Sequence, residues 1–71
     1  MLPHFPQLRT ELESRVLART GRRVRNLNIE LSLDCVILRG QAATFHVKQL
    51  AQHGVWDVLP DVRLANDIVV E

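Results

Sequence analysis

The strongest structural signal in this 71-residue chain lies in the middle of its sequence. From Leu27 to Leu33, leucine or isoleucine occupies every second position, with polar residues between them. That period of two is typical of a β-strand with one buried face. A polar break follows at Asp34-Cys35, and a second apolar run ends at Gly40. The stretch predicts a β-hairpin. Its inner face is expected to comprise Leu27, Ile29, Leu31, Leu33, Val36 and Leu38.

The residues before this hairpin have the spacing of an amphipathic helix. Apolar residues recur every four positions on one helical face, at Leu8, Leu12 and Val16. Pro6 suits the first turn of a helix, and Gly21 suits the position just after the last turn. We predict a flexible leader at residues 1–5 and a helix at about residues 6–20.

A second helix is predicted between Thr44 and Pro60. Thr44 is a suitable N-cap, and Pro60 prevents much continuation of the helix. The apolar stripe of this helix consists of Val47, Leu50, Ala51, Gly54, Val55 and Val58. Gly54 is expected either to cap the C-terminus or to allow close approach to the sheet.

A third strand is predicted at residues 62–70, after hairpin strands at about residues 24–33 and 35–39. The core-facing residues of the third strand are Val62, Leu64, Ile68 and Val70. Asn66 interrupts that face, and we expect it to lie at a sheet edge or to bond nearby backbone groups. The pattern leaves open whether the third strand pairs with the first strand or with the second.

The order of these elements, α-β-β-α-β, predicts an α+β fold with one domain at residues 6–71. The apolar face of a three-stranded sheet must be buried, and two helices packed on that face can bury it. The single Cys35 excludes an internal disulfide and fits a reducing compartment. Because the N-terminus has neither the basic segment nor the apolar segment of a secretory signal, we expect a soluble cytoplasmic protein. No apolar run approaches the length of a membrane span.

Positive charge is concentrated in the first third of the chain. Residues 1–25 carry six arginines against two glutamates, a net charge of +4, although the whole chain has a net charge of +1. The predicted anion-binding site consists of Arg15, Arg19, Arg22, Arg23 and Arg25. Such a cluster suits lipid headgroups, nucleic-acid phosphates or the carboxylates of a protein. The alternative is a solvated helix end with no ligand.

Several motifs resemble the BON domain, a small bacterial module with the same α-β-β-α-β order. The family commonly has acidic-Gly-Val-x-Leu-x-Gly where this chain has Asp34-Cys35-Val36-Ile37-Leu38-Arg39-Gly40. Leu50-Ala51 fits the second helix of the family. Pro60-Asp61-Val62 and Asn66-Asp67-Ile68-Val69-Val70 are similar to Pro-Gly-Val and Asn-x-Ile-x-Val. Cys35 and Asp61 stand where the family has turn glycines.

The resemblance implies a binding module without catalytic residues. BON domains are associated with the bacterial envelope, phospholipid surfaces and protection against osmotic shock, and many are periplasmic. The residues give no independent sign of an enzyme. His46 and His53 are too far apart along a helix to share a metal, and Cys35 has no paired base in view. We expect no enzymatic activity, no cofactor and no metal site.

Two further surfaces are candidate partner interfaces. Phe45 and Trp56 share one stripe of the second helix, where they either face a partner or fold against the first helix or a loop. Ile37 and Val69 are apolar residues on the open face of the sheet, and that face is either partly solvated or packed against a second copy of the chain.

The sequence thus supports three functional hypotheses. The first is a BON-like module that binds anionic phospholipid headgroups or a protein partner through its arginines. The second is a structural or assembly domain that acts through homo-oligomerisation. A small nucleic-acid-binding protein is the weakest of the three, because the arginine cluster contains no aromatic residue for base stacking.

Overall fold

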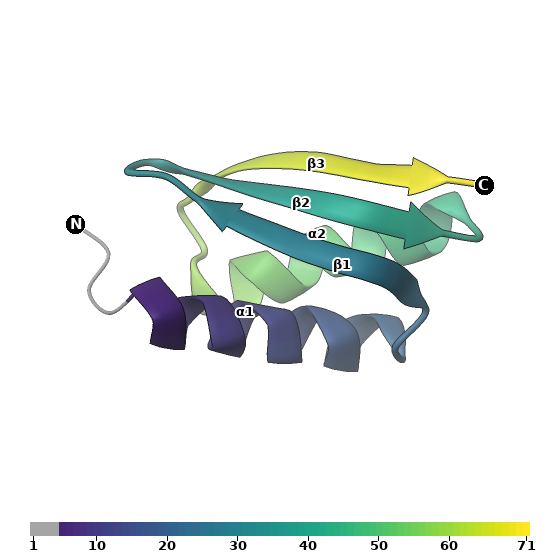
Figure 1. Cartoon of the computed structure of the whole chain (residues 1–71), viewed down its shortest axis with the longest axis horizontal. Helices are drawn as coiled ribbons and strands as arrows, with labels where there is room; N and C mark the ends of the chain where they lie inside the picture. The colour runs from purple at the N-terminus through teal and green to yellow at the C-terminus, as the bar shows by residue number, and fades with distance from the viewer. Residues whose placement is uncertain (1–4) are drawn as a thin grey trace.

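The computed structural model describes the backbone of residues 5–71 and the side chains from residue 7 onward. The elements are α1 (Phe5–Thr20), β1 (Val24–Leu31), β2 (Cys35–Ala42), α2 (Phe45–Val58) and β3 (Arg63–Val70). This order confirms the predicted α+β fold (Figure 1). Most of the predicted leader, residues 1–4, lies outside the described residues, whereas Phe5 is the first residue of α1.

The strands form a three-stranded mixed sheet in the order β1-β2-β3. β1 and β2 are antiparallel, as in a hairpin, and β3 runs parallel to β2. The third strand therefore pairs with the second, the point that the sequence leaves open. Both helices lie on one side of the sheet, with α1 packed against α2 and β1, and α2 also against β3 (Figure 1). The opposite face of the sheet carries no helix.

One apolar core fills the space between the helices and the sheet. Its fully or almost fully buried members are Leu12, Val16, Val24, Ile29, Val36, Leu38, Ala42, Val47, Ala51, Val55 and Ile68. The predicted inner faces of both helices and of β2 supply most of these residues. Burial of this set is the main stabilising contribution, since a side chain of this kind contributes about 1.5–3 kcal/mol when fully buried.

A β-bulge in β1 changes which residues face the core. The pairing with β2 shifts between Arg25 and Asn28, so that two residues of β1 lie opposite Gly40. Asn26 has φ of 55°, and Gly40 has φ of 152°. A Cβ at Gly40 would lie 2.9 Å from the carbonyl oxygen of Arg25, so only glycine fits beside the bulge. As a result both Val24 and Ile29 are buried, although strict alternation would separate them.

Two residues predicted to face the core are exposed instead. Leu33 is 82% exposed, because β1 ends at Leu31 and the hairpin turn comes earlier than predicted. In this turn the N–H and the hydroxyl of Ser32 both donate to the carbonyl oxygen of Cys35, at 2.9 and 3.1 Å. Val70 is 43% exposed, because it lies at the end of β3 opposite the last residue of β2.

The predicted helix ends are confirmed. At the end of α1, Arg22 N–H donates to the Leu17 carbonyl and Gly21 N–H to the Ala18 carbonyl. Together with φ of 62° at Gly21, these bonds form a Schellman motif. At the start of α2, the Thr44 hydroxyl oxygen accepts a 3.2 Å hydrogen bond from the N–H of Val47.

Asn66 fulfils both expectations for a polar residue on the inner face of β3. The strand lies at the edge of the sheet, and the Asn66 amide donates to the carbonyl oxygen of Lys48 at 2.8 Å. Its side-chain oxygen accepts from the N–H of Ile68 at 3.3 Å. Asn66 therefore joins the edge strand to α2.

Gly54 allows close approach to α1, whereas the sequence predicted either a C-cap or an approach to the sheet. It lies inside α2 and is buried. A Cβ on Gly54 would lie 2.9 Å from the Cα atom of Val16 and 3.2 Å from the carbonyl oxygen of Arg15. These are backbone atoms, so the two helices touch at their backbones and no side chain could move aside.

We expect Gly54→Ala to destabilise the fold, although alanine favours a helix by about 1 kcal/mol over glycine. Forcing a methyl group into a packed site costs about 1–3 kcal/mol, and here the helices themselves must separate. Denaturant unfolding of dilute protein should show a net loss of up to about 2 kcal/mol, the packing cost less the gain in helix propensity. Gln49→Ala, at an exposed position of α2, is the control and should change stability by less than about 0.5 kcal/mol. A Gly54→Ala protein as stable as the wild type would contradict the close contact.

Candidate anion-binding site

The five arginines of the predicted anion-binding site lie around the C-terminal end of α1. Arg15 and Arg19 are on the helix, Arg22 and Arg23 are in the following turn, and Arg25 is on β1. All five are exposed. Their guanidinium groups differ in their hydrogen-bond and ion-pair partners within the fold. Those partners determine which of the five could contact a ligand.

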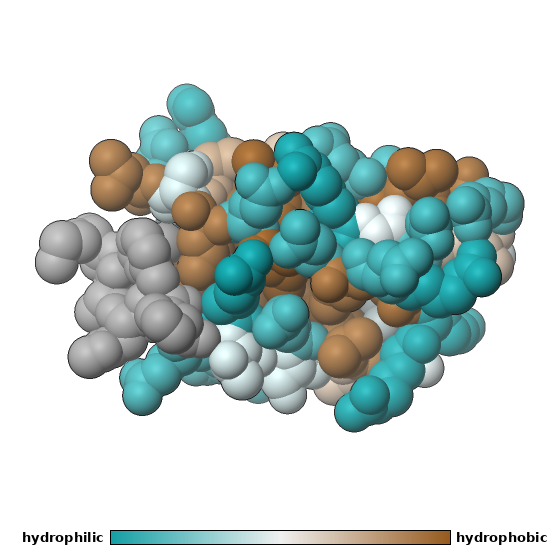
Figure 2. Space-filling model, in the orientation of Figure 1, coloured by the Kyte–Doolittle hydropathy of each residue, from teal (hydrophilic) through white to brown (hydrophobic). Residues whose placement is uncertain are grey.

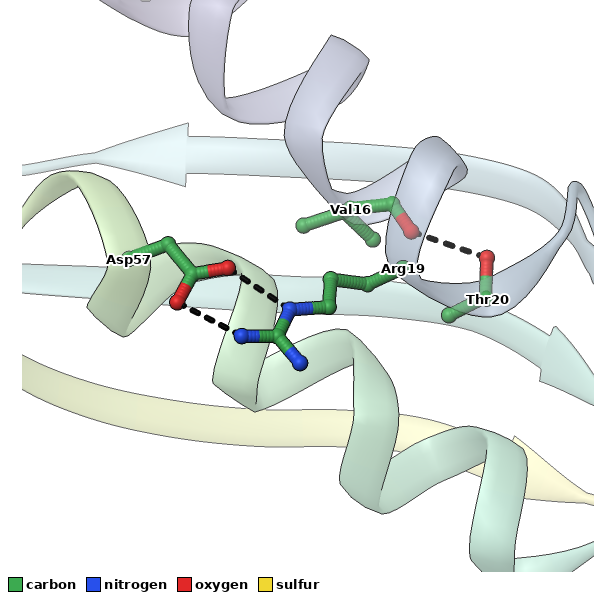
Figure 3. Close-up of polar contacts among 4 residues, drawn as sticks. All are labelled: Val16, Arg19, Thr20 and Asp57. Atoms are coloured by element: carbon green, nitrogen blue, oxygen red, sulfur yellow. Dashed lines mark hydrogen bonds and ion pairs between the residues drawn. The ribbon is translucent and has the colours of Figure 1, made fainter.

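Arg19 is engaged by a carboxylate from the other helix (Figure 3). Its Nε and a terminal nitrogen donate to the two oxygens of Asp57, at 2.7 and 2.8 Å. The hydrogen bond from Arg19 lowers the pKa of Asp57, and the same bond raises the pKa of Arg19. This two-pronged ion pair joins α1 to α2 and removes Arg19 from the candidate site.

Two other arginines also have partners within the fold. Arg25 forms an ion pair of 2.6 Å with Glu71. Arg23 donates from its Nε to the carbonyl oxygen of Thr20 at 2.8 Å, at the end of α1. A carbonyl oxygen is a neutral acceptor, so Arg23 keeps its positive charge, whereas the charge of Arg25 is compensated.

Arg15 and Arg22 lie beside shallow depressions on the outer side of α1. Arg15 lines one depression and Arg22 lines its neighbour, and both depressions include Thr10, Ser14 and Ala18. Neither guanidinium forms a hydrogen bond or ion pair with a residue from 7 to 71. Ser14 and Ala18, which line both depressions, have small side chains. Glu11 lines the same depression as Arg15, and Glu13 lines the same depression as Arg22.

The predicted partner residues of α2 face outward. Phe45 is 57% exposed and Trp56 is 37% exposed, so neither side chain is buried. The indole N–H of Trp56 donates to the carbonyl oxygen of Val62 at 3.4 Å, and its ring meets the edge of His53 at 6.1 Å. The Trp56 end of the stripe thus lies beside the segment that leads into β3.

The open face of the sheet is more polar than the predicted interface suggests. Ile37 is half-buried and Val69 is 57% exposed, but Glu30 and Arg39 form an ion pair beside Ile37. In Figure 2, which views the strands in front of α2, hydrophilic side chains separate the apolar ones. The residues of this face do not form one continuous apolar patch for a second copy.

Several contacts were invisible in the sequence. The acids that compensate Arg19 and Arg25 lie 38 and 46 residues away, so no local pattern indicates them. Arg9 was not singled out, yet its Nε donates to the carbonyl oxygen of Ile29 on the outer edge of β1 at 2.9 Å. Among the described residues, no helix is long and apolar enough to cross a membrane. The same residues contain no cluster of three or more His, Cys, Asp or Glu side chains suited to a metal ion.

No protein-family model, curated protein or solved structure matches this chain. The resemblance to BON domains therefore stays a prediction from the quoted motifs. In the fold, Cys35 is the first residue of β2, and Asp61 lies in the turn before β3.

The Arg19–Asp57 ion pair makes a pH-dependent contribution to stability. Because the pKa of Asp57 is lower in the fold than its ordinary value of 3.8, this contribution is present above pH 4 and is lost as the pH falls through the lowered value. Asp57→Asn should therefore be less stable than the wild type at pH 7, and the difference should shrink in acid. Unfolding at a series of pH values tests this, with Asp61→Asn as the exposed control. A constant difference between the wild type and Asp57→Asn from pH 7 to pH 2 would contradict it.

Proposed function

We propose that this chain is a non-enzymatic binding module that contacts anionic phospholipid headgroups through Arg15, Arg22 and Arg23. One observation carries the proposal. Arg15 and Arg22 border adjoining depressions on α1 and form no hydrogen bond or ion pair with a carboxylate among residues 7–71. Arg23 adds a third charge at the end of the same helix. The resemblance to BON domains, which are associated with phospholipid surfaces, supports the same class of ligand.

The expected binding is electrostatic and weak. A basic residue near an anionic membrane contributes about 1 kcal/mol, so three of them give only modest affinity. The attraction falls off within a Debye length of about 8–10 Å at physiological salt. The depressions are shallow, and the positive charges are spread over the surface. This arrangement suits the headgroups of a membrane surface better than a single enclosed ligand. The absence of an aromatic residue among these arginines makes nucleic acid a poorer candidate.

Vesicle co-sedimentation tests the proposal directly. The protein should bind vesicles that contain phosphatidylglycerol, should not bind vesicles of phosphatidylcholine alone, and should be released by added salt. Arg15→Gln/Arg22→Gln should weaken binding by about 30-fold, since two contributions of about 1 kcal/mol are lost.

A matched control distinguishes loss of the arginine site from a general loss of positive charge. Arg39→Gln/Lys48→Gln also removes two positive charges, one from the open face of the sheet and one from α2. This variant should weaken vesicle binding by less than about threefold if the attraction is local to the arginine site. Equal weakening by the two double variants, or no binding of the wild type to phosphatidylglycerol vesicles, would contradict the proposal.

A further inference from the structure

β3 leaves one edge of the sheet open. It is the last strand in the order β1-β2-β3, and it forms the upper rim of the sheet in Figure 1. The N–H of Glu71 donates to the carbonyl of Ala42 on β2, and the N–H of Ile68 donates instead to the side chain of Asn66. In a regular parallel ladder alternate residues bond to the neighbouring strand. The backbone groups of Leu64 and Asn66 therefore point away from β2, toward solvent.

The edge formed by β1 is less available than the edge formed by β3. Arg9 donates to the carbonyl of Ile29 on β1 and also to the side-chain oxygen of Asn28 at 3.2 Å. Such contacts protect an edge strand from pairing with another chain. At the edge of β3, Asn66 protects the N–H of Ile68 in the same way. No bond of this kind covers the backbone groups of Leu64 and Asn66 among the described residues.

The outward stripe of α2 flanks the open edge of β3. Gln52 accepts a hydrogen bond of 3.2 Å from Asn66, and Trp56 donates to the carbonyl of Val62. Phe45 lies on the same stripe, eleven residues before Trp56, which is about three helical turns. The open backbone groups and the two exposed aromatic side chains thus belong to one side of the molecule.

The charges on β3 are complementary to those of a second β3 in the antiparallel direction. If the two-fold axis passes between the Ala65 residues of two copies, Arg63 of each copy lies opposite Asp67 of the other. Both residues are exposed, and neither has an ion-pair partner among residues 7–71. In this register Leu64 lies opposite Asn66, so each of these pairs exchanges two backbone hydrogen bonds.

Neighbouring registers lack this complementarity. A two-fold axis at Asn66 places Arg63 opposite Val69 and forms no Arg63–Asp67 pair. An axis at Asp67 brings two Asp67 carboxylates face to face, and like charges opposite each other destabilise a strand pair. That axis also places Arg63 opposite Glu71, but Glu71 is already paired with Arg25 of its own copy. Charge therefore selects the register centred on Ala65.

The position of α2 agrees with the same axis. Asn66 bonds to Lys48 and Gln52, which places the middle of the Phe45–Trp56 stripe level with the centre of β3. A two-fold axis there brings Phe45 of each copy toward Trp56 of the other, on the helical side of the sheet. Paired aromatic side chains add about 0.5–1.5 kcal/mol beyond the apolar area that they bury.

We propose that two copies of this chain associate through their β3 edges, with three strands from each copy in one continuous sheet. A two-fold axis perpendicular to the sheet keeps the helices of both copies on one face. Each copy contributes Arg63 and Asp67 on the open face of the sheet, and Phe45 and Trp56 on the helical face. The arginine site at the end of α1 lies outside this interface, so the proposal is independent of lipid binding.

Sedimentation equilibrium of the whole chain and of charge variants tests the proposal. Arg63→Asp should weaken self-association by about tenfold, because two attractive pairs become repulsive, and Asp67→Arg should do the same. An equimolar mixture of these two variants should form a heterodimer of wild-type strength. In that heterodimer the introduced aspartate faces the introduced arginine, and the unchanged Asp67 of one variant faces the unchanged Arg63 of the other. Circular dichroism of each variant should match the wild type, as both positions are exposed.

A control and a second signal separate this interface from the open face of the sheet. Ile37→Lys should leave self-association intact, because Ile37 lies on β2 and on the open face. The emission of Trp56, the only tryptophan, should shift to shorter wavelength as the wild type dimerises. A wild type that stays monomeric at about 1 mM would overturn the proposal. So would self-association that neither charge variant weakens, or a mixture of the two variants that does not associate.

Discussion

The contact between Gly54 and the backbone of Val16 is the constraint on which the other parts of this structure depend. It brings α1 and α2 together without intervening side chains, so both helices fit over one face of a three-stranded sheet. Thr20, fully buried one turn later, donates its hydroxyl to the Val16 carbonyl at 2.9 Å and so leaves no unpaired polar group at the junction. Arg19 and Asp57 close the outer side of the same junction. With α2 held against α1, the outer edge of β3 has no helix to cover it.

Local patterns predicted most of the fold, because most of its elements obey local rules. The spacing of Leu12 and Val16, the N-cap at Thr44 and the alternation in β2 each identify an element without reference to the rest of the chain. The alternation in β1 places Leu27, Ile29 and Leu31 on the core side correctly. It misses Val24, because the bulge at Asn26 inserts one residue and reverses the side on which Val24 lies. The position of the bulge depends on the pairing of β1 with Gly40 of β2. The alternation of apolar residues in the sequence of β1 does not indicate it.

The candidate site was predicted in outline only. The sequence located a group of arginines correctly at the end of α1, but their availability depends on acids that the fold brings in from α2 and from the C-terminal end of β3. Of the five, Arg19 and Arg25 form ion pairs within the fold, and Arg23 bonds to a backbone carbonyl. Arg15 and Arg22 form no hydrogen bond or ion pair among residues 7–71. The Phe45–Trp56 stripe was recognised as a surface from helical spacing alone. Its position beside an open strand edge required the parallel pairing of β2 with β3, which the sequence left undecided.

Residue-specific hydrogen exchange of the β3 amides tests most directly whether the open edge of β3 binds a second copy of the chain. In dilute solution, Ala65, Asp67 and Val69 should be protected by β2, whereas Leu64 and Asn66 should exchange rapidly. At high protein concentration, Leu64 and Asn66 should become protected while the odd-numbered amides change little. If Leu64 and Asn66 exchange equally fast at both concentrations, the edge does not pair with a second copy and the account is wrong.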